Sequence, residues 1–257
     1  MTHRTPPLLP LAALVLVACG APRDPDLEKR ALKAQAAAAA DRAATPLPDA
    51  PTIAPAAAAV LPKSYANDEV RRIMAAVPGQ GRALWAEFRT QAGTIKCALD
   101  EAAAPQTVAN FVGLATGQVP WSDGARSPAS QSAFYDGLTF HRVVSNFIIQ
   151  TGNPGRQVGG GPGWTLPRET GAPTAFDAPG ALAMIDAGAD SHGSQLFMTT
   201  RPDPSLKPRY TAFGRCAEVD VIRTISNGDK VPAADGKSSS VPRDPVRIFS
   251  LKVFRAD

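Results

Sequence analysis

Arg142 and Gln150 stand out in the apolar segment FHRVVSNFIIQTGNP, residues 140–154, because their side chains could act on a ligand. A guanidinium stays charged in proteins and is costly to bury alone, so Arg142 needs a partner or a purpose. One interpretation pairs it at the surface with a carboxylate such as Asp136. The other places it at the edge of an apolar binding site, where it donates hydrogen bonds to a ligand and the neutral Gln150 amide orients it.

Other catalytic patterns have little support in the sequence. His141 and His192 stand alone in their neighbourhoods, so we expect no metal site and no cofactor. Ser194, in SHGSQ, lacks the Gly-x-Ser-x-Gly turn, and a base adjacent in sequence to its nucleophile rarely has the right geometry, so a serine hydrolase is not favoured. The glycine-rich residues 152–164 lack the Lys-Ser/Thr of a phosphate-binding loop and are interpreted as a surface loop beside a binding groove.

The segments that would position these residues have the pattern of short strands separated by turns. Two helices are predicted, over 105–117 and over 217–226. In the first of them, Pro105 suits the first turn and Gly117 suits the position just after the last turn. Many strands with two isolated helices favour a barrel or a sandwich over alternating βαβ units. The strands are predicted at 83–90, 94–100, 140–144, 145–152, 180–185, 194–200, 210–216 and 246–254.

The N-terminal residues have the pattern of an export signal. The apolar run Leu8–Val17 is shorter than the about 20 residues that cross a bilayer. It ends in LVAC followed by Gly20, which resembles the bacterial lipoprotein signal box, where the cysteine is lipidated and becomes the new N-terminus. We therefore expect a signal peptide at 1–18 and lipidation at Cys19. A cleaved signal with an incidental cysteine is the alternative.

Residues 19–62 are rich in alanine and proline and are interpreted as a tether, because they cannot bury a core. In residues 63–82, apolar residues recur at the spacing of a helix, so this segment is predicted to be a short helical lead-in. It either packs on the folded domain, residues 83–257, or stays separate from it. This organisation predicts a lipid-anchored domain on the periplasmic side of a bacterial cell envelope. Gly20, in place of an acidic residue after Cys19, favours the outer membrane of a Gram-negative cell.

Charge and cysteine content add two expectations. The formal net charge of +4 comes without a block of basic and aromatic residues, so nucleic acid is not an expected partner. Cys97 and Cys216 lie in strand-like runs, and an exported chain meets an oxidising compartment. The two residues form a disulfide if their strands are neighbours, or they are two buried thiols; the sequence leaves both open.

Several motifs together resemble the cyclophilin family of peptidyl-prolyl cis/trans isomerases. They are APQTVANFVGLATG, FYDGLTFHRVVSNFIIQTGNP, GALAMIDAGADSHGSQLFMTT and YTAFGR, and the resemblance covers residues 83–257. It implies a mainly β fold, a closed eight-stranded antiparallel β-barrel with two capping helices. It also implies catalysis of rotation about X–Pro peptide bonds without a cofactor.

Position by position, Arg142 matches the catalytic arginine of the family. Glutamines that hold the substrate backbone and apolar residues that form the proline pocket are implied in the same way. The substrate-binding residues expected from the resemblance are Phe147, Ile148, Gln150, Ile185, Asp186, Gln195, Phe197, Leu206 and Tyr210.

Of the departures from the family pattern, three bear on which ligands the site would accept. Ile185 stands where alanine is usual, which is expected to narrow the neighbouring subsite. Asp186 replaces a common asparagine, and its charge is expected to disfavour acidic substrates. The loop tryptophan of many members is missing near Ser205, which leaves the binding of cyclosporin open.

The function expected from these observations is isomerisation of X–Pro bonds in exported proteins, by a monomer that assists their folding at the envelope. The barrier, about 18–20 kcal/mol, comes from amide resonance, and crossing it breaks no covalent bond. Neither a nucleophile nor a metal is therefore required. The alternative is a chaperone module that binds proline-containing segments with little turnover.

Overall fold

The structure is a computed structural model of the 257-residue chain. The predicted signal peptide, Cys19 and nearly all of the predicted tether lie outside the residues that it describes. No helix in the described part of the chain is long and apolar enough to cross a bilayer. The described residues are 61–122, 130–155, 160–169, 176–188, 191–207, 209–232 and 240–257.

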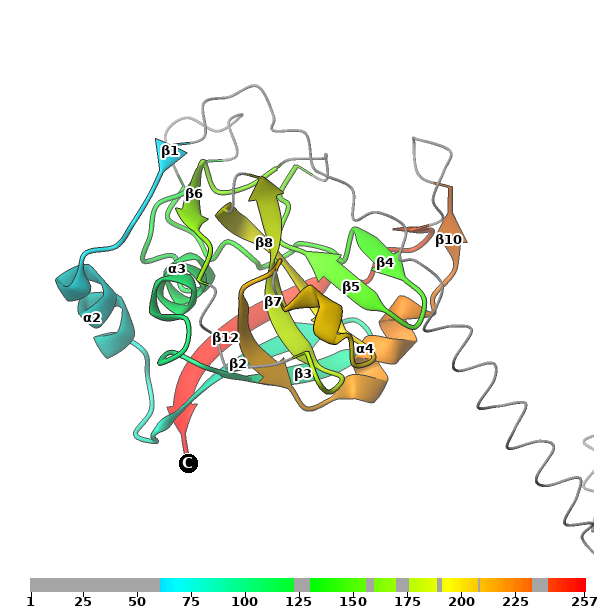
Figure 1. Cartoon of the computed structure of the whole chain (residues 1–257), viewed down its shortest axis with the longest axis horizontal. Coiled ribbons are helices and arrows are strands. Elements are labelled where there is room, and N and C mark those ends of the chain that lie inside the picture. The colour runs from blue at the N-terminus through cyan, green and yellow to red at the C-terminus, as the bar shows by residue number, and fades with distance from the viewer. Residues whose placement is uncertain are drawn as a thin grey trace, which may run out of the picture. The chain divides into compact units, whose positions relative to one another are not determined.

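Ten strands form one sheet, in which neighbours pair in the order β1-β6-β8-β7-β9-β3-β2-β12 (Figure 1). The strand β5 also pairs with β8, and β4 pairs with β5. All of these pairs are antiparallel except β1 with β6. The strands of this sheet are β1 (Leu61–Pro62), β2 (Ala83–Thr90), β3 (Gly93–Leu99), β4 (Arg142–Val144), β5 (Ile148–Thr151), β6 (Trp164–Pro167), β7 (Ala181–Gly188), β8 (Ser191–Thr199), β9 (Ala212–Cys216) and β12 (Ile248–Ala256). A separate two-stranded sheet pairs β10 (Lys230–Val231) with β11 (Val241–Pro242).

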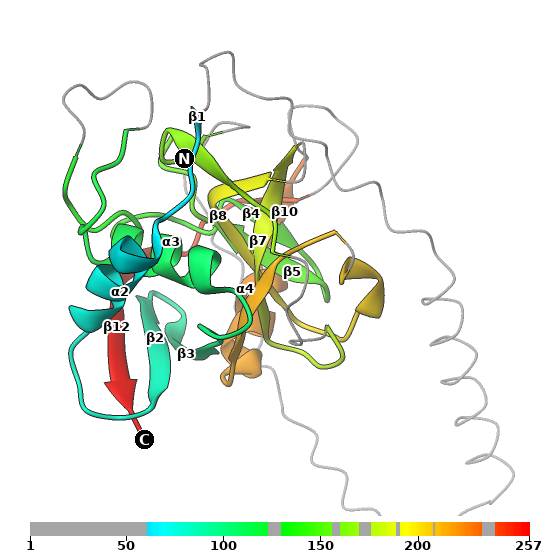
Figure 2. The ribbon, with the colours of Figure 1, turned by 60° about the vertical axis from the view of Figure 1, so that its left-hand side comes forward.

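The sheet curls into an open half-barrel (Figures 1 and 2), and the closed barrel that was expected is not shown. Within the described residues, β4 does not pair with β12, although a single bridge joins Thr139 to Arg247 just before these strands. Closing a barrel needs a continuous ladder between its two edges. The strand β4 has three residues, which limits the ladder that it can form.

The two predicted helices are present as α3 (Pro105–Ala115) and α4 (Val219–Ser226). Pro105 begins α3, and Gly117 follows its end with a φ of 73°, a left-handed conformation that suits glycine. The carboxylate of Glu169 accepts hydrogen bonds from the N–H groups of Gln106 and Thr107, which otherwise lack partners at the start of a helix. Phe111 of α3 packs in the main hydrophobic core, where its ring centroid lies 5.3 Å from that of Phe213.

The lead-in segment, residues 63–82, packs on the domain, which is one of the two alternatives that the sequence left open. Its helix, α2 (Asn67–Ala75), lies beside α3 (Figure 2) and buries Ile73 in the main core. Tyr65 is 3% exposed, and its hydroxyl donates to Asn110 Oδ1 at 3.0 Å. The ammonium of Lys63 lies 4.4 Å from the Tyr65 ring centroid and 4.3 Å from that of Trp164, so cation–π contacts also hold this segment.

Cys97 and Cys216 lie directly opposite each other on β3 and β9, and a disulfide joins them. Both residues are buried. The tertiary structure thus selects the disulfide from the two alternatives that the sequence left open.

Candidate active site

A hairpin places Arg142 beside Gln150. The strands β4 and β5 pair in a register that sets Arg142 opposite Gln150, across a turn in which Asn146 has a φ of 54°. Asparagine tolerates this left-handed conformation better than most residues. Arg142 Nη1 donates a long hydrogen bond of 3.4 Å to Gln150 Oε1.

A chain of amides fixes the orientation of Gln150. Gln150 Nε2 donates to Gln195 Oε1 at 2.8 Å, and Gln195 Nε2 donates to the carbonyl oxygen of Gly160 at 2.8 Å. Both glutamines are buried, at 4% and 7% exposure. Because each amide uses its NH₂ group on the next acceptor in the chain, Gln150 presents its oxygen to the guanidinium.

The surface ion pair considered for Arg142 is not formed. Asp136 Oδ1 accepts the backbone N–H of Leu251 at 2.8 Å, and no other carboxylate among the described residues pairs with Arg142. Burial lowers the pKa of the half-buried Arg142, but an arginine stays protonated over the physiological range. The site therefore contains a positively charged hydrogen-bond donor that a ligand can engage.

An apolar cluster adjoins this donor and is distinct from the main core. Phe197 lies within it, 2% exposed and opposite Gln150 in the β5–β8 register. Tyr210 packs edge-on to the Phe197 ring at 5.1 Å between centroids. We define the apolar cluster as Ile148, Phe176, Ala181, Ala183, Phe197, Leu206 and Ala212, with Val144, Phe147, Ile185 and Tyr210 packed against it.

The structure thus brings most of the predicted site residues together. Leu206 reaches the cluster from the short 3₁₀-helix η1 (Pro204–Leu206). Ile185 is half-buried against the cluster, where a branched side chain occupies more space than an alanine. Ser205, near the position of the missing tryptophan, donates its N–H and hydroxyl to Asp203 Oδ1.

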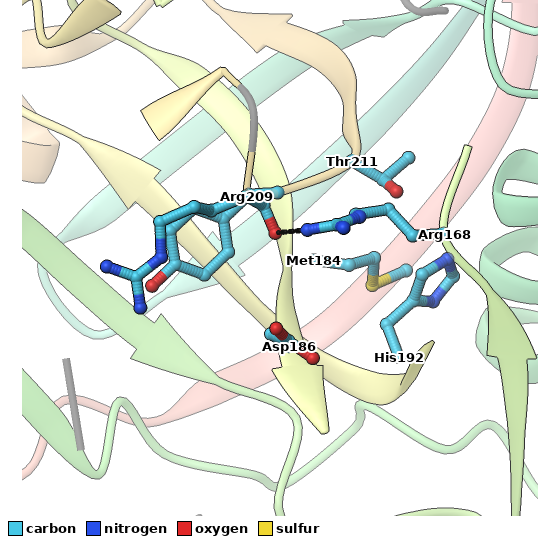
Figure 3. Close-up of a pocket in the computed structure, with 7 residues that line it drawn as sticks. Arg168, Met184, Asp186, His192, Arg209 and Thr211 are labelled. Carbon is cyan, nitrogen blue, oxygen red and sulfur yellow. Dashed lines mark hydrogen bonds between the residues drawn. The ribbon is translucent and has the colours of Figure 1, made fainter. Parts of the chain in front are cut away.

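Asp186 lies beside the apolar cluster, close to Tyr210. It lines a small neighbouring pocket (Figure 3), and Tyr210 belongs both to the lining of this pocket and to the apolar cluster. Asp186 Oδ1 accepts the N–H of Gly188 at 2.8 Å. The other lining residues are Arg168, Met184, His192, Arg209 and Thr211.

The structure adds residues that sequence reasoning missed. Phe176 stacks on Phe197 with the ring planes 4° apart and the centroids 6.1 Å apart. The guanidinium groups of Arg201 and Arg209 lie over the rings of Phe147 and Tyr210. An isolated aromatic residue in TAFDAPG was the available signal for Phe176, whereas nothing in the local sequence distinguishes these two arginines from other surface arginines.

The half-buried His141 and the buried His192 are expected to make stability depend on pH. Burial lowers the pKa of His141 to about 4, with the neighbouring Arg142 charge as a second cause, and burial lowers that of His192 to about 4. The ordinary value is about 6.5, so between pH 4 and 6.5 the unfolded chain binds more protons than the folded one. Stability is therefore full above pH 6.5 and lost as the pH falls towards 4. The free energy of unfolding should be about 3 kcal/mol lower at pH 5 than at pH 6.5.

Urea unfolding at these two pH values measures this loss. In the His192→Asn variant about half of the loss should disappear, because His141 alone then titrates in this window. Ordinary carboxylates contribute mainly below pH 5. A wild-type free energy of unfolding that stays constant over the window would contradict the prediction.

The amino-acid sequence is similar to known bacterial isomerases. Residues 85–253 match the family described as cyclophilin type peptidyl-prolyl cis-trans isomerase/CLD. Peptidyl-prolyl cis-trans isomerase A of Mycobacterium tuberculosis is 41% identical over 168 residues, which cover 65% of this chain and 91% of that protein. Peptidyl-prolyl cis-trans isomerase B of Bacillus subtilis is 43% identical over 129 residues, 49% of this chain and 79% of that protein.

The fold is similar to that of a cyclophilin-type isomerase from Cryptosporidium parvum, with a TM-score of 0.56 and 24% identity. The similarity covers 68% of this chain and 99% of that protein. A structure of the same protein in the presence of the dipeptide Ala-Pro gives a TM-score of 0.55. At this identity, the likeness shows a shared mainly β fold.

Proposed function

The chain belongs to the family of cyclophilin-type peptidyl-prolyl cis-trans isomerases, and from this premise we propose that it isomerises X–Pro bonds of exported proteins at the cell envelope. Its activity is that of a peptidyl-prolyl isomerase, as its relatives are named. The proposal goes further in three respects: the residues that perform the reaction, the exported substrates, and the lipid anchor.

In the proposed mechanism, the apolar cluster binds the proline ring and Arg142 acts on the twisted peptide bond. Half-way through the rotation, the prolyl nitrogen loses its resonance with the carbonyl group, and its lone pair can accept a hydrogen bond. A guanidinium that donates to this nitrogen stabilises the twisted state more than the planar ground state, which accelerates the reaction. Arginine suits this role better than lysine, because its planar fork can reach the nitrogen and the preceding carbonyl oxygen together.

The observation that carries this mechanism is the hydrogen-bonded chain from Arg142 through Gln150 to Gln195, which adjoins the apolar cluster. This hydrogen-bonded chain supplies a charged donor that pairs with no carboxylate of the described residues, held by neutral amides that add no charge of their own. A residue that was needed only for packing would not require this arrangement.

The proposed location at the envelope is supported by the buried disulfide between Cys97 and Cys216, since such bonds persist mainly in oxidising compartments. The apolar run before Cys19 and the alanine- and proline-rich residues after it support an exported, lipid-anchored and tethered domain. One acyl chain binds a membrane only marginally, so stable anchoring takes two or more chains.

The anchor is tested by Cys19→Ser. In a Gram-negative host, the wild-type protein is expected in the membrane fraction and the variant in the soluble fraction, because serine cannot carry the thioether-linked lipid. Cys97→Ser combined with Cys216→Ser is the comparison variant, which removes the disulfide but keeps Cys19 and should stay in the membrane fraction. Retention of the Cys19→Ser variant in the membrane fraction would refute lipid anchoring.

A second candidate function is the binding of proline-containing segments with little turnover. The observation in its favour is Ile185, whose branched side chain packs against the apolar cluster and takes up space there. Binding without acceleration of isomerisation in the wild-type protein would favour this candidate.

A further inference from the structure

We infer that the site prefers proline-containing peptides with an acidic side chain next to the proline, and that Arg209 and Arg201 determine this preference. The inference rests on the proposed function, because it concerns the substrates of the same site. It is carried by the position of the two arginines relative to the aromatic side chains of the apolar cluster.

Arg209 is the stronger determinant. It is exposed, and its guanidinium lies 5.8 Å from the ring centroid of Tyr210. Arg168 Nη1 donates to the Arg209 carbonyl oxygen at 2.8 Å, which holds the backbone of this residue in place (Figure 3). No carboxylate of the described residues forms an ion pair with Arg209, so its charge is available to a ligand.

Arg201 lies over the ring of Phe147, as Arg209 lies over that of Tyr210. The Arg201 guanidinium lies 5.2 Å from the centroid of the Phe147 ring, and the side chain is 41% exposed. Asp203 lies 3.5 Å from it, a distance at the long end for an ion pair. Asp203 Oδ1 also accepts hydrogen bonds from Ser205. Arg201 is therefore partly neutralised, and we assign it the smaller effect.

A peptide bound on the apolar cluster would contact both aromatic side chains, since Phe147 and Tyr210 both pack against it. Its residues next to the proline would then lie near guanidinium groups. Arg142, which forms no ion pair with a carboxylate of the described residues, adds a third positive charge. An anionic side chain is attracted to this arrangement and a cationic one is repelled.

Acidic residues near the site only partly oppose these charges. Asp186 lines the small pocket together with Arg168 and Arg209, so its carboxylate shares that pocket with two positive charges (Figure 3). Asp203 is paired with Arg201. Arg142, Arg201 and Arg209 together outnumber the carboxylates of Asp186 and Asp203. The site is thus expected to favour acidic substrates, whereas the charge of Asp186 alone suggested that it would disfavour them.

The test compares peptides that differ only in the residue before or after proline, which is glutamate, alanine or lysine. NMR exchange between the cis and trans signals measures kcat/KM without an auxiliary protease. At low ionic strength the glutamate peptide should exceed the lysine peptide by about three- to tenfold, from one or two exposed charge interactions. In about 0.5 M salt this ratio should approach one, because screening shortens the reach of exposed charges.

Arg209→Gln should lower the ratio of the glutamate to the lysine peptide by about two- to threefold, and Arg201→Gln by less. The matched control is Arg71→Gln, which removes an equal charge from the exposed side of α2 and should leave the ratio unchanged. A wild-type ratio of one at low salt would overturn the inference, and so would an equal loss in Arg209→Gln and Arg71→Gln.

The alanine peptide separates this inference from the proposed function. Turnover of the alanine peptide together with a glutamate-to-lysine ratio of one refutes the charge preference and leaves the isomerase intact. Failure to accelerate any of the three peptides refutes the proposed function, and the inference falls with it.

Discussion

Arg142→Ala is expected to lower kcat/KM for an X–Pro peptide by about 100- to 1,000-fold, the usual effect of removing a donor that stabilises developing charge or a lone pair in a transition state. The peptide should still bind, because the apolar cluster that receives the proline ring is unchanged. The loss should therefore fall mainly on kcat, as for an interaction made only in the transition state. Arg142→Lys keeps the charge but not the planar fork, and should recover only a small part of the activity.

A protease-coupled assay or NMR exchange measures these rates, and far-UV circular dichroism checks that each variant is folded. Arg71→Ala, which removes an exposed arginine from α2, is the matched control and should retain the wild-type rate. Equal rates in the wild-type and Arg142→Ala proteins, both above the uncatalysed rate, would show that Arg142 is not the catalyst. Equal rates at the uncatalysed level would favour the binding module.

Loss of the disulfide should have the largest effect on stability. Cys97 and Cys216 are 119 residues apart, and closing a loop of this length removes much conformational freedom from the unfolded chain. Cys97→Ala combined with Cys216→Ala should lower the free energy of unfolding by about 3–5 kcal/mol. Since domains are typically stable by about 5–15 kcal/mol, this loss is a large fraction of the total.

Urea unfolding with and without a thiol reductant distinguishes the bond from the packing of the two side chains. The reductant should lower the unfolding midpoint of the wild-type protein, whereas the midpoint of the double alanine variant should not respond. If the reductant fails to shift the midpoint under conditions where mass spectrometry shows two free thiols, the disulfide does not stabilise the fold.

The positions of Arg142, the proposed catalytic residue, and Gln150 could be predicted from local sequence, since both residues lie on one hairpin. Arg142 and Gln150 are eight residues apart, and the β4–β5 turn alone sets them opposite each other. Gln195 lies 45 residues beyond Gln150, so its hydrogen bond depends on the pairing of β5 with β8. The motif resemblance predicted this residue, whereas periodicity could not.

Other parts of the site and fold required the tertiary structure. The expected closed barrel was derived from the number of strands and the family resemblance, but closure depends on which edges pair, and the sheet is an open half-barrel. Phe176 was missed because it reaches the apolar cluster from outside the predicted strands. The position of Asp186 beside Tyr210, Arg168 and Arg209 depends on how β7 pairs with β8 and β9.

By itself, the sequence determined the features that neighbouring residues control: the limits of α3 at Pro105 and Gly117, the short strands, and the hairpin that carries Arg142. The tertiary structure decided the contacts between distant segments. It joined Cys97 to Cys216, packed the lead-in on α3, and placed Arg201 and Arg209 over aromatic rings of the site. The physical reason is that local backbone preferences depend on adjacent side chains, whereas a contact across the fold depends on the register of several strands at once.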